Sequence, residues 1–328
     1  MLGCETVIYV KYKSTPSIRN ILSLLLFVGN ISMLLFILKY PREVLDAAKD
    51  GLMLWFTNVL PALLPFIVIT NMLVGLGFIR VMGKIMRPIM QYVFGLPGAG
   101  GVALIVGLIS GYPMGAKTVA DLCKNGEISI EEAGHLLKFC NNAGPLFLVG
   151  VVGVGLLGDS TAGYVLWAGH GLTALFMGIV TRKHVNCNSF NKNVTMKIGS
   201  TNVAKVLTDA VKNAMDALVF VGGLIIFFSV VVRVVLVIFG DGYYMGVVAG
   251  IIEVTNGAKM LADTTGVISA TTLAAIGGII GFGGVSVHAQ VVHFTAGTGV
   301  RVGEYIMYKL LHGVLAAGAT WIIWVAVV

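Results

Sequence analysis

The sequence predicts an all-α, polytopic membrane protein whose two halves are related repeats. Apolar residues make up 57% of the 328-residue chain and charged residues only 11%, and the mean hydropathy of +0.93 lies far above that of soluble domains. A polar segment at residues 107–121 recurs in altered form at residues 250–263, and an apolar segment with a glycine-rich break follows each copy. These patterns predict inverted-topology repeats with two re-entrant hairpins and two discontinuous helices.

The repeat depends on identities in and around the polar segments. GAKTVAD (115–121) and GAKMLAD (257–263) share five of seven residues, and the breaks FCNNAGP (139–145) and GFGGVSV (281–287) keep the same offset of 142 residues. Upstream, DAAKDGL begins at residue 46 and DAVKNAM at residue 209, an offset of 163, because the first half carries an extra segment. We therefore expect an N-terminal segment and anchor span (1–40), a first repeat (41–180), a basic loop (181–205) and a second repeat (206–328).

The first half begins with a polar, mildly basic stretch, followed by an apolar run at residues 21–38 that is long enough to cross a bilayer. We interpret this run as an anchor span rather than a signal peptide, because no small-residue cleavage site follows it. Residues 41–56 predict an interfacial amphipathic helix that continues into a span kinked by Pro61 and Pro65. The basic residues of segment 79–94 alternate with Met and Ile at helical spacing, which predicts a helix along the membrane surface.

Residues 98–123 predict the first re-entrant hairpin, because they are too few for two crossings and too polar in the middle for one. Ser129 and Glu132 fit a capping box that begins a new helix. Pro145 must interrupt that helix, since proline removes one backbone donor and frees the carbonyl four residues earlier. A further span is expected at residues 161–180.

The 181–205 connection carries five basic residues and no acidic residue, so the positive-inside rule places it in the cytoplasm of the synthesising cell. Three crossings separate the two hairpins, so they are expected to enter the membrane from opposite faces. The second half repeats the plan with an amphipathic helix (202–216), a span (217–239), the second hairpin (243–266), a broken span (268–294) and a final span (305–327).

Composition and motifs argue against other classes of protein. Basic residues cluster at the ends of apolar segments, so the net charge of +7 indicates membrane orientation rather than nucleic-acid binding. The four cysteines have neither metal nor disulfide spacing, and His288 and His293 lie five residues apart on different helix faces, which argues against metal ligation. The sequence has no phosphate-binding loop, HExxH motif or serine elbow. We therefore expect no enzyme activity, no metal and no cofactor, and leave open whether a proton or a sodium ion is coupled.

Two hairpin tips that meet near the midplane would enclose a water-filled cavity, together with the unwound backbone of the broken helices. Amides at the start of each second arm would favour a carboxylate or another anionic group. The breaks also offer His288 and Gln290. The substrate-binding residues that we expect are Ser110, Gly111, Tyr112, Pro113, Met114 and Lys117 of the first hairpin, Asn141 and Asn142 of the first break, Glu253, Thr255 and Asn256 of the second hairpin, and Ser286 of the second break.

Several of these residues have a structural alternative. Glu253 lies among apolar residues, and an acid there is costly in a membrane unless it serves a ligand, a proton or a partner such as a lysine. Asn141 and Asn142 could instead cap the broken helix, and the serine of the second break could allow close helix packing. Lys117 and Lys259 each lie four residues before an aspartate, so a neutralising pair within the hairpin competes with substrate contact.

The pairing of SGYPMGAK (110–117) with FCNNAGP (139–145) resembles the sporulation integral membrane protein family of the YlbJ type, within the wider group that carries the nucleoside-recognition or gate domain. The resemblance covers residues 40–324, and GFGGVSV is its weaker part. It implies a fold similar to that of concentrative nucleoside transporters. In endospore formers it also implies passage of dipicolinic acid from mother cell to forespore across the outer forespore membrane.

By this resemblance the chain would be a multi-pass transporter of a small anionic aromatic solute in the cell membrane or outer forespore membrane. A nucleoside or nucleobase transporter and a non-transporting sporulation factor stay open as alternatives. Its partners would be the lipid bilayer and a small-molecule substrate but no nucleic acid, and a homo-oligomer stays open. A dianionic pyridine dicarboxylate suits the hairpin N-termini and Lys117, whereas a charged Glu253 would repel it. A protonated Glu253, donating to a carboxylate or carrying a coupled proton, would resolve that conflict, since burial favours the neutral acid.

Overall fold

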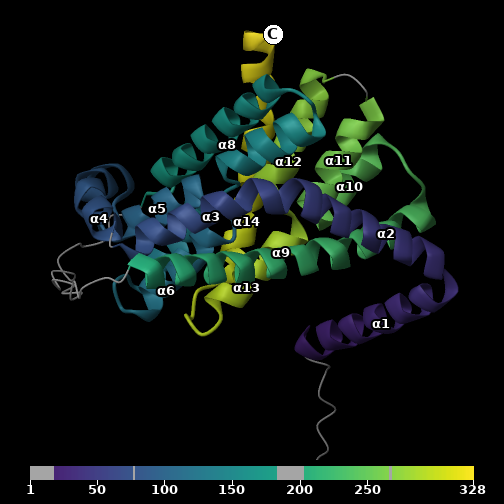
Figure 1. Cartoon of the computed structure of the whole chain (residues 1–328), viewed down its shortest axis with the longest axis horizontal. Helices are drawn as coiled ribbons and strands as arrows, with labels where there is room; N and C mark the ends of the chain where they lie inside the picture. The colour runs from purple at the N-terminus through teal and green to yellow at the C-terminus, as the bar shows by residue number, and fades with distance from the viewer. Residues whose placement is uncertain (1–17, 77, 183–202, 266–267) are drawn as a thin grey trace, which may run out of the picture. The chain divides into compact units, whose positions relative to one another are not determined.

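The computed structural model describes residues 18–76, 78–182, 203–265 and 268–328, and every regular element in these ranges is a helix (Figure 1). The all-α prediction is therefore confirmed for this part of the chain. The polar start of the chain and most of the basic loop at 181–205 lie outside the described residues. Within them, five helical stretches are long and apolar enough to span a membrane: Pro41–Leu73, Ser160–Val180, Val203–Phe239, Ala270–Thr295 and Val302–Val327.

The chain divides into two units, Met1–Leu45 and Asp46–Val328. The first unit contains α1 (Ile18–Lys39), which is the helix expected from the apolar run, and the beginning of α2 (Pro41–Leu54). Large apolar side chains of α1 are exposed from Leu24 to Leu38. Such a surface suits contact with lipid tails, as an anchor span requires.

The first span contains a π-helical segment next to a proline. α2 continues through η1 (Trp55–Val59) into α3 (Leu60–Gly75), and the N–H of Leu60 donates to the oxygen of Trp55, five residues earlier. Pro61 follows directly and has no N–H to donate, so it cannot continue the ordinary hydrogen-bond ladder. The wider π turn accommodates this interruption without ending the helix.

Two short helical hairpins occupy the predicted positions. α4 (Phe78–Ile89) and η2 (Met90–Phe94) precede the first hairpin, which consists of α5 (Gly100–Ile109) and α6 (Met114–Lys124). The second hairpin consists of α10 (Tyr243–Ile252) and α11 (Val254–Thr265). Each arm has 10 to 12 residues, which at 1.5 Å per residue gives about 15–18 Å, roughly half of a bilayer core.

Matching glycines let both hairpins fold tightly. A Cβ atom on Gly115 would lie 3.0 Å from Cα of Gly107, and a Cβ atom on Gly257 would lie 2.1 Å from Cα of Gly250. Real Cβ atoms essentially never come as close as 2.1 Å, and a contact of 3.0 Å is tighter than most, so the arms pack this closely because side chains are absent at these positions. The two copies of the polar segment therefore share this contact between glycines of the two arms, in addition to their identical residues.

Both spans predicted to be broken are interrupted at the expected positions. α7 (Ile130–Cys140) begins at the predicted capping box, in which Glu132 N donates to Ser129 Oγ (3.2 Å) and Ser129 N donates to Glu132 Oε2 (2.7 Å). A non-helical stretch then leads through Pro145 into η3 (Leu146–Leu156). In the second half, α12 (Ala270–Phe282) and α13 (Gly284–Thr295) are separated by Gly283, whose φ of 92° favours glycine.

The remaining spans pack around these elements. α8 (Ser160–Val180), α12 and α14 (Val302–Val327) meet at Thr320, where Gly169 and Gly277 allow close approach. α9 (Val203–Phe239) packs along α3 and is one continuous helix. The amphipathic helix and the span expected at residues 202–239 are therefore a single element. Apolar side chains from both halves, among them Leu148, Leu166 and Ile276, form one core around the broken helices.

Candidate functional site

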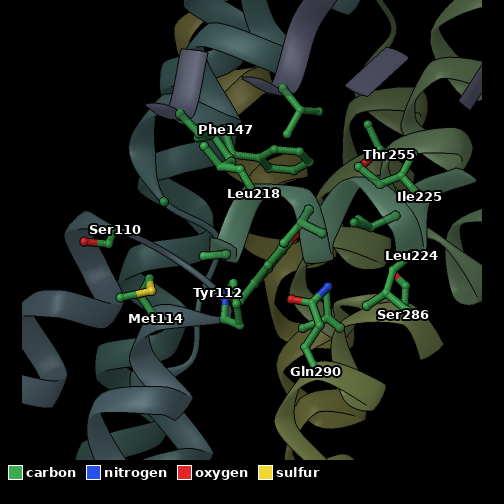
Figure 2. A pocket seen from close by; sticks show the side chains of 18 of the residues that line it. Ser110, Tyr112, Met114, Phe147, Leu218, Leu224, Ile225, Thr255, Ser286 and Gln290 are labelled. Carbon is green, nitrogen blue, oxygen red and sulfur yellow. The ribbon is translucent and has the colours of Figure 1, made fainter. Parts of the chain in front are cut away.

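A chamber lies where the two hairpin tips meet the two breaks (Figure 2). It contains about 670 Å³ of empty space, part of which is open to the outside. Apolar side chains of α3, η3 and α9, such as Leu63, Phe147 and Leu218, form most of its wall. This combination of an apolar wall with a few polar groups is typical of sites that bind small molecules.

Seven of the twelve expected site residues line this chamber, and they come from both hairpins and the second break. They are Ser110, Tyr112, Pro113, Met114, Glu253, Thr255 and Ser286. Gln290 of α13 also lines it. The chamber thus brings together residues that lie more than 140 positions apart in the sequence, while Gly111, Lys117, Asn141, Asn142 and Asn256 lie outside its lining.

Four polar atoms of the lining are buried and have no hydrogen-bond partner among the described residues. They are the hydroxyl oxygens of Ser110, Tyr112 and Ser286 and the Oε1 atom of Gln290. In Figure 2 the Tyr112 ring extends from the first hairpin tip into the middle of the chamber, and its centroid lies 6.1 Å from that of Phe147. Buried polar groups normally have partners, so these atoms are available to a polar solute.

Glu253 is buried at the second tip, and its carboxylate caps the beginning of α11. Its Oε2 atom accepts hydrogen bonds from N (2.7 Å) and Nδ2 (2.9 Å) of Asn256, and its Oε1 atom accepts one from Thr255 Oγ1 (3.1 Å). No lysine forms an ion pair with it in the described part of the chain. The carboxylate therefore occupies part of the helix N-terminus that was expected to face an anion.

The amides at the beginning of α6 are also largely engaged. Gly115 N donates to Gly111 O (3.2 Å), and Lys117 N donates to Pro113 O (3.0 Å). Ala116 N donates to the side-chain oxygen of Asn141 (3.3 Å). Because these backbone donors are used within the protein, hydroxyl and amide side chains are the main polar groups left for a solute.

Asn141 and Asn142 stabilise the first break. Asn141 accepts from Ala116 N and donates through Nδ2 to the hydroxyl of Tyr305 (2.9 Å). Asn142 Nδ2 donates to Phe139 O (2.6 Å), one of the carbonyls left free where α7 ends. These contacts match the capping alternative, although Asn141 also connects the break to the first tip.

The two hairpin lysines differ. Lys259 Nζ lies 2.6 Å from Oδ2 of Asp263, which confirms the expected neutralising pair in the second hairpin. Lys117 and Asp121 form no ion pair within 4.0 Å in the described ranges. The chamber itself is lined by one carboxylate, that of Glu253, and by no Lys, Arg or His among the described residues. A charged carboxylate solute would thus meet no cationic side chain in this lining.

The structure adds a polar cluster that the sequence reasoning missed. Lys309 and His312 of α14 are buried beside the first break, in contact with Asn141 and with the backbone of His170 in α8. Lys309 and His312 could have been found from the sequence, because an ionisable residue inside a membrane span costs free energy and indicates a functional role.

Comparison with known proteins gives two matches. A family model described as "Gate: Nucleoside recognition" matches residues 56–137, which include the first hairpin and most of α7. The chain is also 32% identical over 325 aligned residues to the sporulation integral membrane protein YlbJ of Bacillus subtilis (strain 168), covering 88% of this chain and 79% of that protein. No solved structure matches the chain. The first match includes the expected residues at the first tip, and the second extends over most of both halves.

Proposed function

Because this chain belongs to the family of multi-pass sporulation integral membrane proteins of the YlbJ type, we propose that it transports a small anionic aromatic solute. The solute that we propose is dipicolinic acid, passing from mother cell to forespore across the outer forespore membrane. The observation that carries this proposal is the chamber, which joins both hairpin tips and the second break around four buried polar atoms without partners. A protein that serves only as a scaffold gains nothing from leaving such groups unsatisfied.

The chemistry of the chamber wall suits an aromatic ring that carries polar substituents. This wall is mainly apolar with a few polar groups, which is the usual composition of a small-molecule site. Phe147 and Leu218 can contact the faces or edges of a ring, while the hydroxyls of Ser110, Tyr112 and Ser286 can donate to carboxylate oxygens. The ring and its carboxyl groups would therefore contact different parts of the wall.

Charge limits the form in which such a solute can bind. Glu253 lines the chamber and no basic side chain of the described residues does. Two carboxylates facing each other in a site of low dielectric repel strongly. We therefore propose that Glu253 is protonated while a solute carboxylate lies beside it, or that the solute enters with its own charge neutralised.

We propose that the two halves form an inverted repeat with re-entrant hairpins. Each hairpin arm is roughly half of a bilayer in length, so the chain would return to the face from which it entered. Between the hairpins lie the broken α7–η3 segment, α8 and α9, which amounts to three crossings. An odd number of crossings puts the two entry points on opposite faces, the arrangement of alternating-access transporters.

A nucleoside or nucleobase is the second candidate solute. The match to a nucleoside-recognition model over residues 56–137 and the absence of basic side chains from the described lining both favour an uncharged heterocycle. A non-transporting sporulation factor predicts instead that substitutions at both tips have no effect.

The test is uptake by the purified full chain in proteoliposomes, with labelled dipicolinate, uridine and adenine compared with and without a proton gradient. We expect saturable dipicolinate uptake, which Tyr112→Phe lowers by roughly tenfold because it removes one hydrogen bond to a charged group. Tyr244→Phe is the matched control, since Tyr244 is 83% exposed on α10, outside the chamber lining. Uptake of uridine or adenine in place of dipicolinate would establish the second candidate, and no uptake of any probe would refute transport.

A further inference from the structure

A cluster of ionisable side chains lies behind the first break, separate from the chamber lining. Lys309 of α14 is fully buried (0% exposed), with Nζ 3.2 Å from Asn141 O and 2.8 Å from His312 Nδ1. His312 Nε2 lies 3.1 Å from Thr173 Oγ1 and 3.2 Å from His170 O. Neither Lys309 nor His312 lines the chamber or contributes to the capping of a hairpin tip. The proposed binding of solute thus leaves this buried cluster without a role.

No carboxylate balances Lys309 in the described part of the chain. The titratable groups that face it are His170 of α8, His288 of α13, and Tyr305 and His312 of α14 itself. α12, which packs along α14, has no titratable side chain. On α7, His135 and Cys140 are buried, and Lys138 is paired with Glu304 of α14 (3.4 Å). Glu132 caps the same helix, and Glu131 is exposed. An ammonium ion buried without a counterion costs several kcal/mol.

The hydrogen bonds assign the proton on His312. Thr173 Oγ1 lies 2.8 Å from Gly169 O and 3.0 Å from His170 O, so its hydrogen is directed to a carbonyl of its own helix. The same oxygen can then accept from His312 Nε2, which leaves Nδ1 of that ring as the acceptor for Lys309. In this tautomer the ring can receive a proton from the lysine.

The number of acceptors around Lys309 fits two states of the amine. A neutral amine has two N–H donors, which match Asn141 O and His312 Nδ1. An ammonium has three, and the third finds no acceptor among the described residues. Gain or loss of a proton must therefore change the hydrogen bonding around this group, which makes the two protonation states favour different local arrangements.

Asn141 connects this change to the first hairpin. Its backbone oxygen accepts from Lys309, its side-chain oxygen accepts from Ala116 N of α6, and its Nδ2 donates to Tyr305. Two residues further along the break, Ala143 N donates to His170 Nε2 (2.9 Å), and the rings of His170 and His312 lie 4.5 Å apart. The cluster thus contacts the break at Asn141 and Ala143 and reaches the first hairpin through Asn141.

We propose that Lys309, His312 and His170 form the proton-binding site that couples solute movement to a proton gradient. The site holds its proton as the Lys309 ammonium or, after transfer to His312 Nδ1, as an imidazolium whose Nε2–H stays bonded to Thr173 or to the backbone of His170. Release of that proton from the site leaves a neutral ring beside a neutral amine, whose two N–H groups donate to Asn141 O and His312 Nδ1. The changed hydrogen bond at Asn141 alters the position of the break relative to α6. This inference rests on the proposed transport function and adds its coupling ion, a proton rather than sodium.

The experiment uses the full chain in proteoliposomes, with potassium and valinomycin on both sides so that only the pH gradient drives uptake. Labelled dipicolinate is the first probe and labelled uridine the second. Exchange of labelled for unlabelled solute across the membrane is measured in parallel without a pH gradient. A pH-sensitive dye records proton movement when solute is added. With one proton per solute, one pH unit allows about tenfold accumulation.

For the wild type we expect gradient-driven accumulation and proton movement that accompanies the solute. Lys309→Met should reduce accumulation to none, with no proton movement, while exchange continues. Lys259→Met, at the exposed pair with Asp263, should behave as the wild type. His312→Gln, which retains a polar side chain at the same position, should also lower accumulation, and it serves as the second variant if Lys309→Met does not fold.

The outcomes separate the two proposals. If uridine moves and dipicolinate does not, the proposed solute is wrong, and the coupling site is then tested with uridine. Solute flux in the wild type without proton movement would overturn the coupling site. So would a pH-driven accumulation by Lys309→Met and His312→Gln equal to that of the wild type. If neither probe moves, both proposals are refuted.

Discussion

Substitution of Gly107 by alanine tests the close contact between the first hairpin and the first break. A Cβ atom at this position of α5 would lie 1.6 Å from the carbonyl oxygen of Cys140 and 2.7 Å from its carbonyl carbon. Real Cβ atoms essentially never come within 3.0 Å of such atoms, so α5 and the end of α7 would have to separate by the difference, about 1.4 Å. Both neighbouring atoms belong to the backbone and cannot rotate away.

The expected size of the effect follows from two opposing terms. Alanine is better than glycine in a helix by up to about 1 kcal/mol, whereas overpacking of a well-packed core costs about 1–3 kcal/mol and sometimes more. The backbone contact places Gly107→Ala at the upper end of that range or above it, so a net loss of at least about 2 kcal/mol is expected. At about 2–4 °C per kcal/mol, this lowers Tm by at least about 4 °C.

The assay is thermal unfolding of the purified protein in detergent, with Gly171→Ala as the matched control. Gly171 is also in the interior of an α-helix, α8, but a Cβ atom there would meet nothing within 4 Å. Its Tm should be unchanged or slightly higher, because only the gain in helix propensity remains. If Gly107→Ala is as stable as Gly171→Ala, the first hairpin does not pack on the break as described.

Three further predictions concern a helix cap, the second tip and the topology. Asp159→Ala should lower Tm by about 2–4 °C, since Oδ1 of Asp159 accepts from Thr161 N (2.7 Å) at the beginning of α8 and loss of such a cap costs about 1 kcal/mol. Glu253→Gln should lower the dipicolinate content of spores, because the amide can keep only one of the two oxygens that receive hydrogen bonds at the tip; unchanged content would remove Glu253 from the mechanism. Single cysteines at Asn125 and Asp241, both exposed at hairpin bases, should react with an impermeant thiol reagent from opposite sides of the membrane in a variant without the native cysteines. Labelling of both from one side would exclude the inverted repeat.

Much of the fold could be predicted because its signals are local. The Ser129–Glu132 capping box and the break before Pro145 each depend on a few neighbouring residues, and both are present. The continuity of α9 could not be predicted in the same way. An amphipathic segment followed by an apolar one gives the same pattern whether the two form separate helices or one.

The candidate site was predictable only in part. Tyr112 and Glu253 line one chamber, as the repeat suggested, because the tips of the two hairpins were expected to meet. The capping role of Glu253 was a missed local signal, since an acid directly before a helix can accept hydrogen bonds from its first amides. The contact of Asn141 with Lys309 joins residues 168 positions apart, and only the packing of α14 against α7 brings them together.

The glycine contacts also indicate which parts of the protein can move together. In the first half, Cβ atoms on Gly107 and Gly115 would both collide with Cys140 O, the last residue of α7 before the break. In the second half, a Cβ atom on Gly284, at the second break, would lie 3.0 Å from Gly250 O of α10. Each hairpin is thus packed, backbone against backbone, on the broken helix of its own half, and the chamber lies between the two pairs. Close-packed contacts resist gradual deformation, so each hairpin and the broken helix of its half are expected to move as one unit. Changes of access to the chamber are then expected between these two units, where apolar side chains of α9 and η3 line the wall.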